Sequence, residues 1–198
     1  MVYLAPMEDQ NEVDPESTAN PDFERLEDEL QVFELMIAGY VGSILRAARL
    51  IPEDKWNWSF SERTPTAREV CEHTFVWLWC DRQQLTVADR RLHKPTPNLP
   101  ADRESMIRIL EQESLAWRRL VRSLKPDELN QEREPWEGEQ RLVRSFLFHM
   151  GQHVIYKAGQ IWMLAFDLDP DSPGAYDAPY PNRLYGFSDA APWPAPRA

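Results

Sequence analysis

Two histidines one helical turn apart, His149 and His153, are the residues whose type and spacing most readily suggest chemistry. They lie in residues 140–166, QRLVRSFLFHMGQHVIYKAGQIWMLAF, a long apolar-rich segment without proline. On an α-helix, side chains four positions apart project from the same side, so the two imidazoles could bind one cation. Lys157 and Gln160 fall on the same predicted face, where an ordinary bundle helix carries leucine. The sequence therefore predicts a site on this face.

A third imidazole, His73, lies on the apolar side of another predicted helix and could meet the other two inside the fold. Three converging imidazoles with an open position would hold Zn²⁺, Ni²⁺ or a similar ion, which activates a bound water or thiol at neutral pH. Cys80, two turns after His73, could be a fourth ligand or a buried apolar filler. The remaining histidine, His93, lies in a proline-rich loop and is expected to be exposed. The alternative for the imidazoles is a packed core role with hydrogen-bonded neighbours.

Four amphipathic segments are expected to position these residues. Apolar side chains recur at helical spacing, and a capping box at Thr66 and Glu69 marks the start of the second helix. The predicted helices cover residues 21–50, 66–91, 102–124 and 140–166. The sequence thus predicts an all-α fold, a four-helix bundle. The first and third connections exceed ten residues, which is long enough for one of them to cross the bundle.

The chain is expected to form one domain with two extensions. Residues 1–20 are acidic and poor in large apolar groups, which predicts a flexible leader. The bundle is assigned to residues 21–168. Residues 169–198 are rich in proline and aromatic side chains without helical periodicity, which predicts an extended tail. Its aromatic content suggests packing on the bundle or on a second subunit, as in a homodimer.

Composition disfavours several classes of function. The formal net charge of −11 opposes binding to nucleic-acid phosphates and to anionic membranes, so neither partner is expected. The sequence lacks a glycine-rich phosphate loop, a GxSxG elbow and an HExxH pair, which disfavours phosphoryl transfer and serine hydrolysis. Its two cysteines, Cys71 and Cys80, stand roughly 13 Å apart along one predicted helix, too far for a disulfide. Two reduced thiols and a start unlike a signal peptide favour the cytoplasm.

Two stretches resemble the DinB/YfiT superfamily of four-helix-bundle proteins. Residues 66–73, TAREVCEH, resemble the start of that family's second helix, which provides its first histidine ligand. Residues 153–161, HVIYKAGQI, resemble the HxxYHxGQI segment of its last helix. The likeness extends over about residues 22–166, in order and spacing, and implies the DinB fold.

The resemblance also implies a divalent metal ion, often nickel or zinc, held by three histidines. His73 matches the first ligand and His153 the second, but the third falls on Lys157. His149 could supply the missing nitrogen if the ion were displaced by one helical turn, roughly 5 Å. The alternative is a member of the family that has lost its metal.

Two functions remain open at this point. Family members with known activity include transferases and isomerases that use small thiols, which implies a metal-dependent transferase or hydrolase acting on a small molecule. Lys157 and Tyr156 are then the candidate catalytic residues. The alternative is a metal-free module for dimerisation or ligand binding. In that case Lys157 would pair with a carboxylate such as Glu113, and His149 and His153 would pack in the core.

Overall fold

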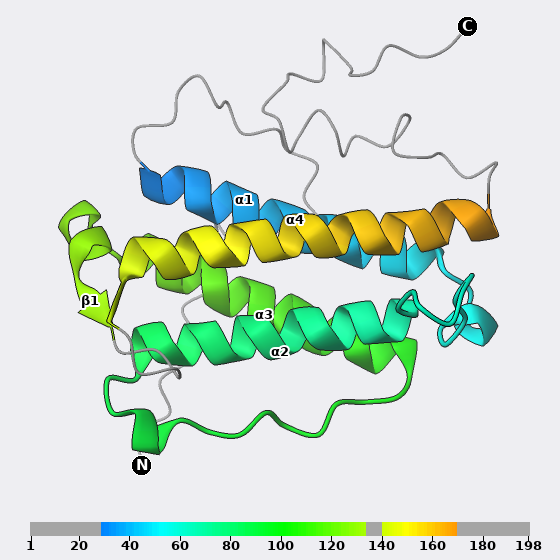
Figure 1. The fold of residues 1–198 in the computed structure, drawn as a ribbon, viewed down its shortest axis with the longest axis horizontal. Coiled ribbons are helices and arrows are strands. Elements are labelled where there is room, and N and C mark those ends of the chain that lie inside the picture. The colour runs from blue at the N-terminus through cyan, green and yellow to red at the C-terminus, as the bar shows by residue number, and fades with distance from the viewer. Residues whose placement is uncertain (1–28, 134–139, 170–198) are drawn as a thin grey trace, which may run out of the picture.

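Four α-helices form a bundle in the computed structural model, which describes residues 29–133 and 140–169 (Figure 1). The helices are α1 (Glu29–Leu50), α2 (Ala67–Thr86), α3 (Arg103–Ser123) and α4 (Val143–Leu168). The all-α bundle expected from the sequence is therefore confirmed. The leader predicted for residues 1–20, the helix start predicted at residue 21 and the tail after residue 169 lie outside the described ranges.

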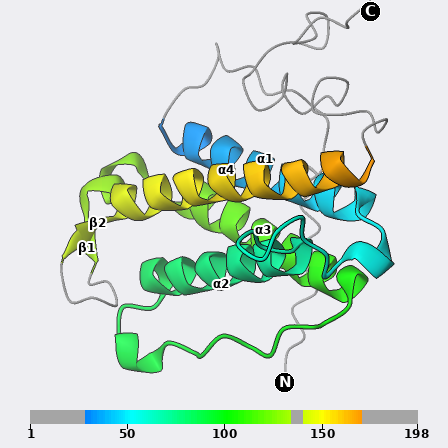
Figure 2. The same ribbon diagram turned by 45° about the vertical axis from the view of Figure 1, so that its right-hand side comes forward.

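The order of the helices around the bundle decides which side chains can meet. α1 packs against α3 and α4, and α2 packs against the same two helices, so α1 and α2 lie on a diagonal. α1 and α4 run in one direction while α2 and α3 run in the other (Figures 1 and 2). The α1–α2 connection therefore crosses the bundle, as the length of that segment suggested. α2 and α4 are antiparallel neighbours, and this pair carries the predicted site residues.

The segment between α2 and α3 differs from the sequence prediction. α2 ends at Thr86 rather than near Arg91, and a 3₁₀ turn, η3 (Arg90–Leu92), follows. Val87 is already extended, and the carboxylate of Asp89 accepts a hydrogen bond from the Arg91 amide. A side chain that caps a new turn competes with continuation of the helix, which accounts for the early end. The chain then runs back along the bundle to reach the start of α3 (Figure 2).

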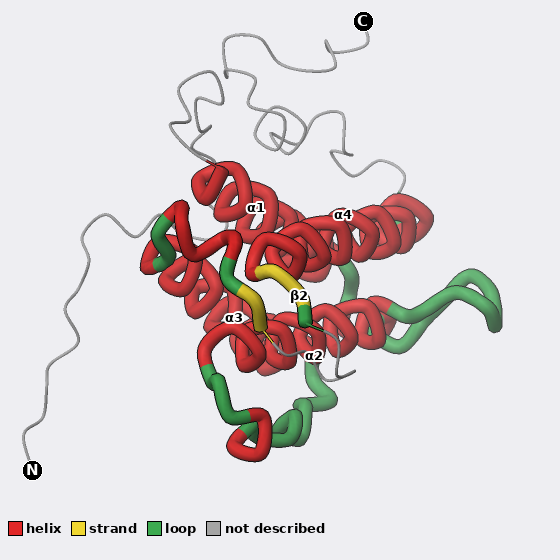
Figure 3. Tube along the Cα trace, turned by 60° about the vertical axis from the view of Figure 1, so that its left-hand side comes forward, coloured by secondary structure: helices red, strands yellow, loops and turns green. Residues whose placement is uncertain are grey.

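The segment before α4 also contains more structure than the loop that was expected. It includes a 3₁₀ helix, η4 (Pro126–Asn130), and two short strands, β1 (Glu132–Arg133) and β2 (Arg141–Leu142). The strands pair antiparallel beside the first turn of α4 (Figure 3). Since residues 141–142 join this pair, α4 begins at Val143 and not at residue 140.

Local signals at other helix starts are confirmed. The Thr66 hydroxyl accepts from the Glu69 amide and the Glu69 carboxylate accepts from the Thr66 amide, which is the predicted capping box. Asp102 caps α3 by accepting from the Ser105 amide. In the α1–α2 connection Trp56 is fully buried against the bundle, whereas Phe60 is exposed.

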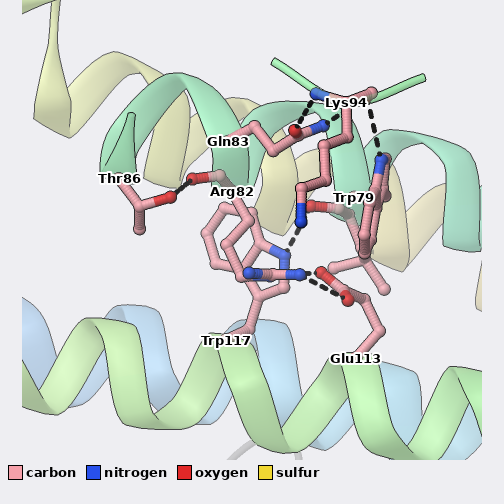
Figure 4. A network of polar contacts seen from close by, with 8 residues as sticks. Trp79, Arg82, Gln83, Thr86, Lys94, Glu113 and Trp117 are labelled. Atoms are coloured by element: carbon pink, nitrogen blue, oxygen red, sulfur yellow. Dashed lines mark hydrogen bonds and ion pairs between the residues drawn. The ribbon is translucent and has the colours of Figure 1, made fainter. Parts of the chain in front are cut away.

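α2 and α3 are joined by a polar network beside the core (Figure 4). The buried indole of Trp117 donates to the Leu78 carbonyl at 2.8 Å, which satisfies its one polar atom. Arg82 makes a bidentate pair with Glu113, whose side chain is 5% exposed, with 2.8 Å between Nη2 and Oε2. The Gln83 carboxamide bonds both the amide and the carbonyl of Lys94, which ties the α2–α3 connection to α2.

Among the described residues, α1 is the one helix whose length and hydropathy would suffice to cross a membrane. Buried residues make up 61% of its most apolar window. α1 packs against α3 and α4, so its apolar surface is used inside the bundle.

Two glycines of α4 provide a matched test of the packing between α1 and α4. A Cβ on exposed Gly159 would meet no atom within 4 Å, whereas one on buried Gly151 would meet Met36 Cε at 2.1 Å. Gly159→Ala is expected to raise the unfolding free energy by about 0.5–1 kcal/mol, because alanine loses less backbone entropy in a helix. Gly151→Ala should gain less, because the Met36 thioether must move. Urea denaturation measures both, and equal gains would contradict the packing described here.

Candidate functional site

The three histidines predicted to form a site lie side by side along the interface between α2 and α4. The ring centroids of His73 and His153 are 5.1 Å apart with an interplanar angle of 17°. The rings of His149 and His153 are 6.1 Å apart. We call His73, His149 and His153 the histidine row. The antiparallel pairing of α2 with α4 brings it together, because His73 lies opposite His153 and the next turns continue the row.

His153 is the unusual member of the histidine row. Both of its ring nitrogens are buried, and neither has a hydrogen-bond partner among the residues that the structure describes. Burial, reinforced by the neighbouring His73, Lys157 and His149, lowers the pKa of His153 from 6.5 to about 3. The ring is therefore neutral near pH 7. A buried polar group without a partner costs about 1–3 kcal/mol, so the site favours a ligand that would satisfy it.

The other two histidines of the row have partners. Nε2 of His73 accepts a hydrogen bond from the indole Nε1 of Trp77 at 2.8 Å. Burial, followed by the charge of Lys157, lowers the pKa of His73. Nδ1 of His149 lies 2.8 Å from the carboxylate of Asp81, which is buried. A carboxylate on one ring nitrogen fixes the orientation of an imidazole and leaves the other nitrogen for a ligand.

Lys157 lies next to the row, where the resemblance places the third histidine ligand. Its side chain is 8% exposed, and its ammonium donates to Oε1 of Gln160 at 2.9 Å. The ammonium also lies 5.3 Å from the centre of the Tyr156 ring, a cation–π distance. Burial lowers the pKa of Lys157.

The suggested pairing of Lys157 with Glu113 is wrong. The Glu113 carboxylate lies between α2 and α3, where both of its oxygens accept from Arg82 (Figure 4). Within residues 29–133 and 140–169, no carboxylate lies within ion-pair distance of Lys157. Among the described residues, the buried cation of Lys157 contacts a neutral carboxamide and an aromatic ring.

Three other candidates have different surroundings from those expected. The Cys80 thiol is hydrogen-bonded to Thr96 in the α2–α3 connection, and burial raises its pKa. His93 is half-buried rather than exposed, with Nε2 2.9 Å from the Val87 carbonyl. Tyr156 is 63% exposed, and its contact with the site is through the ammonium of Lys157.

Two residues of the site were missed by sequence reasoning. Trp77 is 37% exposed and packs on His149 and His153 with ring centroids 5.4 and 5.8 Å away. Asp81, which bonds His149, was not singled out. The spacing of His73, Trp77 and Asp81 by four positions was the available signal, because it places all three on one face of α2.

The fit of a metal ion to this arrangement is partial. In the described ranges, no group of three or more His, Cys, Asp or Glu side chains is placed to hold a metal ion. The rings form a row rather than surround a shared point, because His73 bonds Trp77 and His149 bonds Asp81. The unpaired nitrogens of His153 do fit a metal ligand, and imidazole is a donor that Zn²⁺ and Ni²⁺ accept. The Nε2 lone pair of His73 accepts from the Trp77 indole, so a three-histidine site would require His73 to give up this hydrogen bond.

The lowered pKa of His153 predicts a pH dependence of stability. The pKa of this ring is near 6.5 in the unfolded chain and about 3 in the folded protein. The contribution of the neutral ring to the free energy of unfolding is therefore fully present above pH 6.5. It is lost as the pH falls through that window, because the unfolded state binds the proton more readily. For a partly exposed ring, we expect a loss of about 1 kcal/mol between pH 7 and pH 5.

Urea denaturation in the presence of a chelator, at a series of pH values, measures this loss. The pH dependence of the unfolding free energy is compared between wild type and His153→Leu. The variant should lack the loss caused by His153 and keep the part that comes from the carboxylates. Parallel curves for the two proteins would contradict the burial of a neutral ring at residue 153.

Comparison with known proteins concerns both the fold and this site. A family model described as the DinB superfamily matches residues 42–161, which include the whole histidine row and Lys157. The fold is similar to the crystal structure of a DinB-like protein from Bacillus subtilis, with a TM-score of 0.57 and 14% sequence identity. The match covers 70% of this chain and 91% of that chain. At this identity the likeness concerns the fold alone. No curated protein matches the sequence.

Proposed function

Because the chain belongs to the DinB superfamily, we propose that its histidine row binds a divalent metal ion, nickel or zinc, and serves a small-molecule transferase or hydrolase. The observation that carries this proposal is His153, whose two buried ring nitrogens have no partner in the described part of the chain. A buried imidazole with unpaired nitrogens, next to a second histidine, resembles a metal ligand in a protein that has not bound its ion. When bound, the ion would supply Lewis acidity that activates a thiol or water.

Each residue of the site would have a separate role in binding the ion or the substrate. His73 and His153 would hold the ion once His73 has released the Trp77 indole, and His149 would be the third ligand. Asp81 would keep the proton on Nδ1 of His149, which places the lone pair of the ring on Nε2. Lys157 and Tyr156 would lie at the substrate side as candidate catalytic residues. The proposal assigns the protein to the cytoplasm, where the free Cys71 and Cys80 stay reduced.

A second candidate function is a metal-free module that binds a ligand or a second copy of the chain. The observation in its favour is Lys157, because a buried ammonium next to the row repels a divalent cation. Under this proposal the imidazoles act as neutral hydrogen-bonding groups and as ring surfaces for packing.

Metal analysis of protein purified without a polyhistidine tag separates the two candidates. The first requires a substantial fraction of an equivalent of bound Ni²⁺ or Zn²⁺ after incubation with the ion and removal of the excess. His153→Ala should lose that metal while keeping its helical circular dichroism. No bound metal in the folded wild-type protein would eliminate the first candidate. A variant that keeps its metal would remove His153 from the ligand set.

A further inference from the structure

The ammonium of Lys157 lacks the partner that a buried cation normally has. A lysine side chain that is 8% exposed is rare unless paired, because removal of its charge from water costs several kcal/mol. Of its three N–H donors, the structure assigns one to Oε1 of Gln160. No carboxylate in the described ranges lies within ion-pair distance. A bound anion that is not part of the described residues would therefore be stabilised next to Lys157.

His153 supplies a second unused group at the same place. It precedes Lys157 by four residues on α4, so the two side chains project from adjacent turns of one face. An imidazole has at least one N–H donor, and neither ring nitrogen of His153 is bonded to a residue of the described ranges. His73 lies against the His153 ring, with its centroid 5.1 Å away, and encloses the site from the α2 side.

We propose that Lys157 and His153 together bind the carboxylate of a small molecule at the α2–α4 interface. One carboxylate oxygen accepts from the ammonium of Lys157, and the other accepts from the ring N–H of His153. This single contact would satisfy both the unpaired cation and the unpaired imidazole. The inference names the substrate class of the proposed function and rests on it only for the identity of the site, since binding of the carboxylate needs no metal.

The charges of the site favour a monoanion of this kind. The ammonium of buried Lys157 supplies one positive charge to the site, and one negative charge would balance it. A carboxylate has two acceptor oxygens in a plane, which matches two donors on adjacent helical turns. A phosphate dianion would add a charge that nothing here balances, in a chain whose net charge is already −11.

The test uses full-length, chelator-treated protein labelled with ¹⁵N in its histidine rings. Sodium propionate is titrated at constant ionic strength, with sodium chloride replaced as propionate is added. We expect the ring nitrogens of His153 to shift saturably, with a dissociation constant on the order of millimolar for so small a ligand. Propionamide, which is neutral and nearly the same shape, should produce no saturable shift.

Variants of lysine identify the cation. Lys157→Met should weaken propionate binding at least tenfold, whereas Lys125→Met, at an exposed lysine of the α3–η4 junction, should leave it unchanged. Lys157→Gln serves as a second variant in case the methionine variant does not fold. The proposal is overturned by the absence of a saturable shift, by equal binding in the Lys157 variants, or by tighter binding of inorganic phosphate. Metal analysis fails or succeeds independently, so the two proposals are tested separately.

Discussion

Lys157→His is expected to raise the affinity of the chain for Ni²⁺ or Zn²⁺ by about two orders of magnitude or more. The change replaces a buried cation next to the histidine row with a third or fourth imidazole. A structural zinc site of four ligands is worth about 10–16 kcal/mol, or roughly 3 kcal/mol per ligand, which corresponds to about a hundredfold in affinity. Removal of the like charge adds to this gain. Isothermal titration calorimetry with untagged protein measures the effect.

The contributions of charge and ligand can be separated with two further substitutions at the same residue. Lys157→Met removes the ammonium without adding a donor, so it should give about a tenfold gain from the loss of repulsion alone. Lys157→Arg keeps the charge and should give none. If the histidine variant binds the ion no better than the methionine variant, residue 157 does not point toward a shared metal position.

Arg82→Ala is expected to lower the unfolding free energy by about 3 kcal/mol. Its guanidinium is the bidentate partner of Glu113, a carboxylate that is 5% exposed between α2 and α3. Removal of one member of a buried pair leaves the other charge uncompensated, which costs about 3–5 kcal/mol. The lower figure is expected here, because Arg82 is itself 22% exposed and water can reach the cavity. Chemical denaturation at pH 7 measures the change.

A double variant and a surface pair are the controls for this prediction. Arg82→Met combined with Glu113→Leu should recover most of the loss, because two apolar side chains of similar volume need no compensation. Arg91→Ala breaks the exposed pair with Asp89 and should have no measurable effect. A loss as large for Arg91 as for Arg82 would mean that burial of Glu113 does not decide the cost.

Most of the fold could be predicted from the sequence because helical periodicity and capping residues act locally. The Thr66–Glu69 box and the Asp102 cap depend on neighbours three positions away, and both are present. The end of α2 and the start of α4 could not be predicted as well. The first depends on a 3₁₀ turn capped by Asp89, and the second on pairing between β1 and β2, which are separated in sequence. Periodicity carries no information on either competition.

The sequence predicted that the three histidines would lie together, but it predicted neither the roles of Trp77 and Asp81 nor the geometry of the rings. Spacing placed His149 and His153 on one face of a helix, and the structure brings His73 to them. The bond from Trp77 to His73 and that from Asp81 to His149 depend on rotamers, which the sequence does not specify. The predicted pairing of Glu113 with Lys157 was wrong because Glu113 faces α2, where it pairs with Arg82.

The placement of α1 beside α4 has a consequence for biosynthesis. α1, the one described helix that is long and apolar enough to cross a membrane, is made before α4, which is one of its two packing partners. Until α4 has left the ribosome, α1 can cover its apolar face only against α3. During that interval the nascent chain exposes part of the apolar surface of α1. Chaperones would then have the greatest influence on the yield of folded protein.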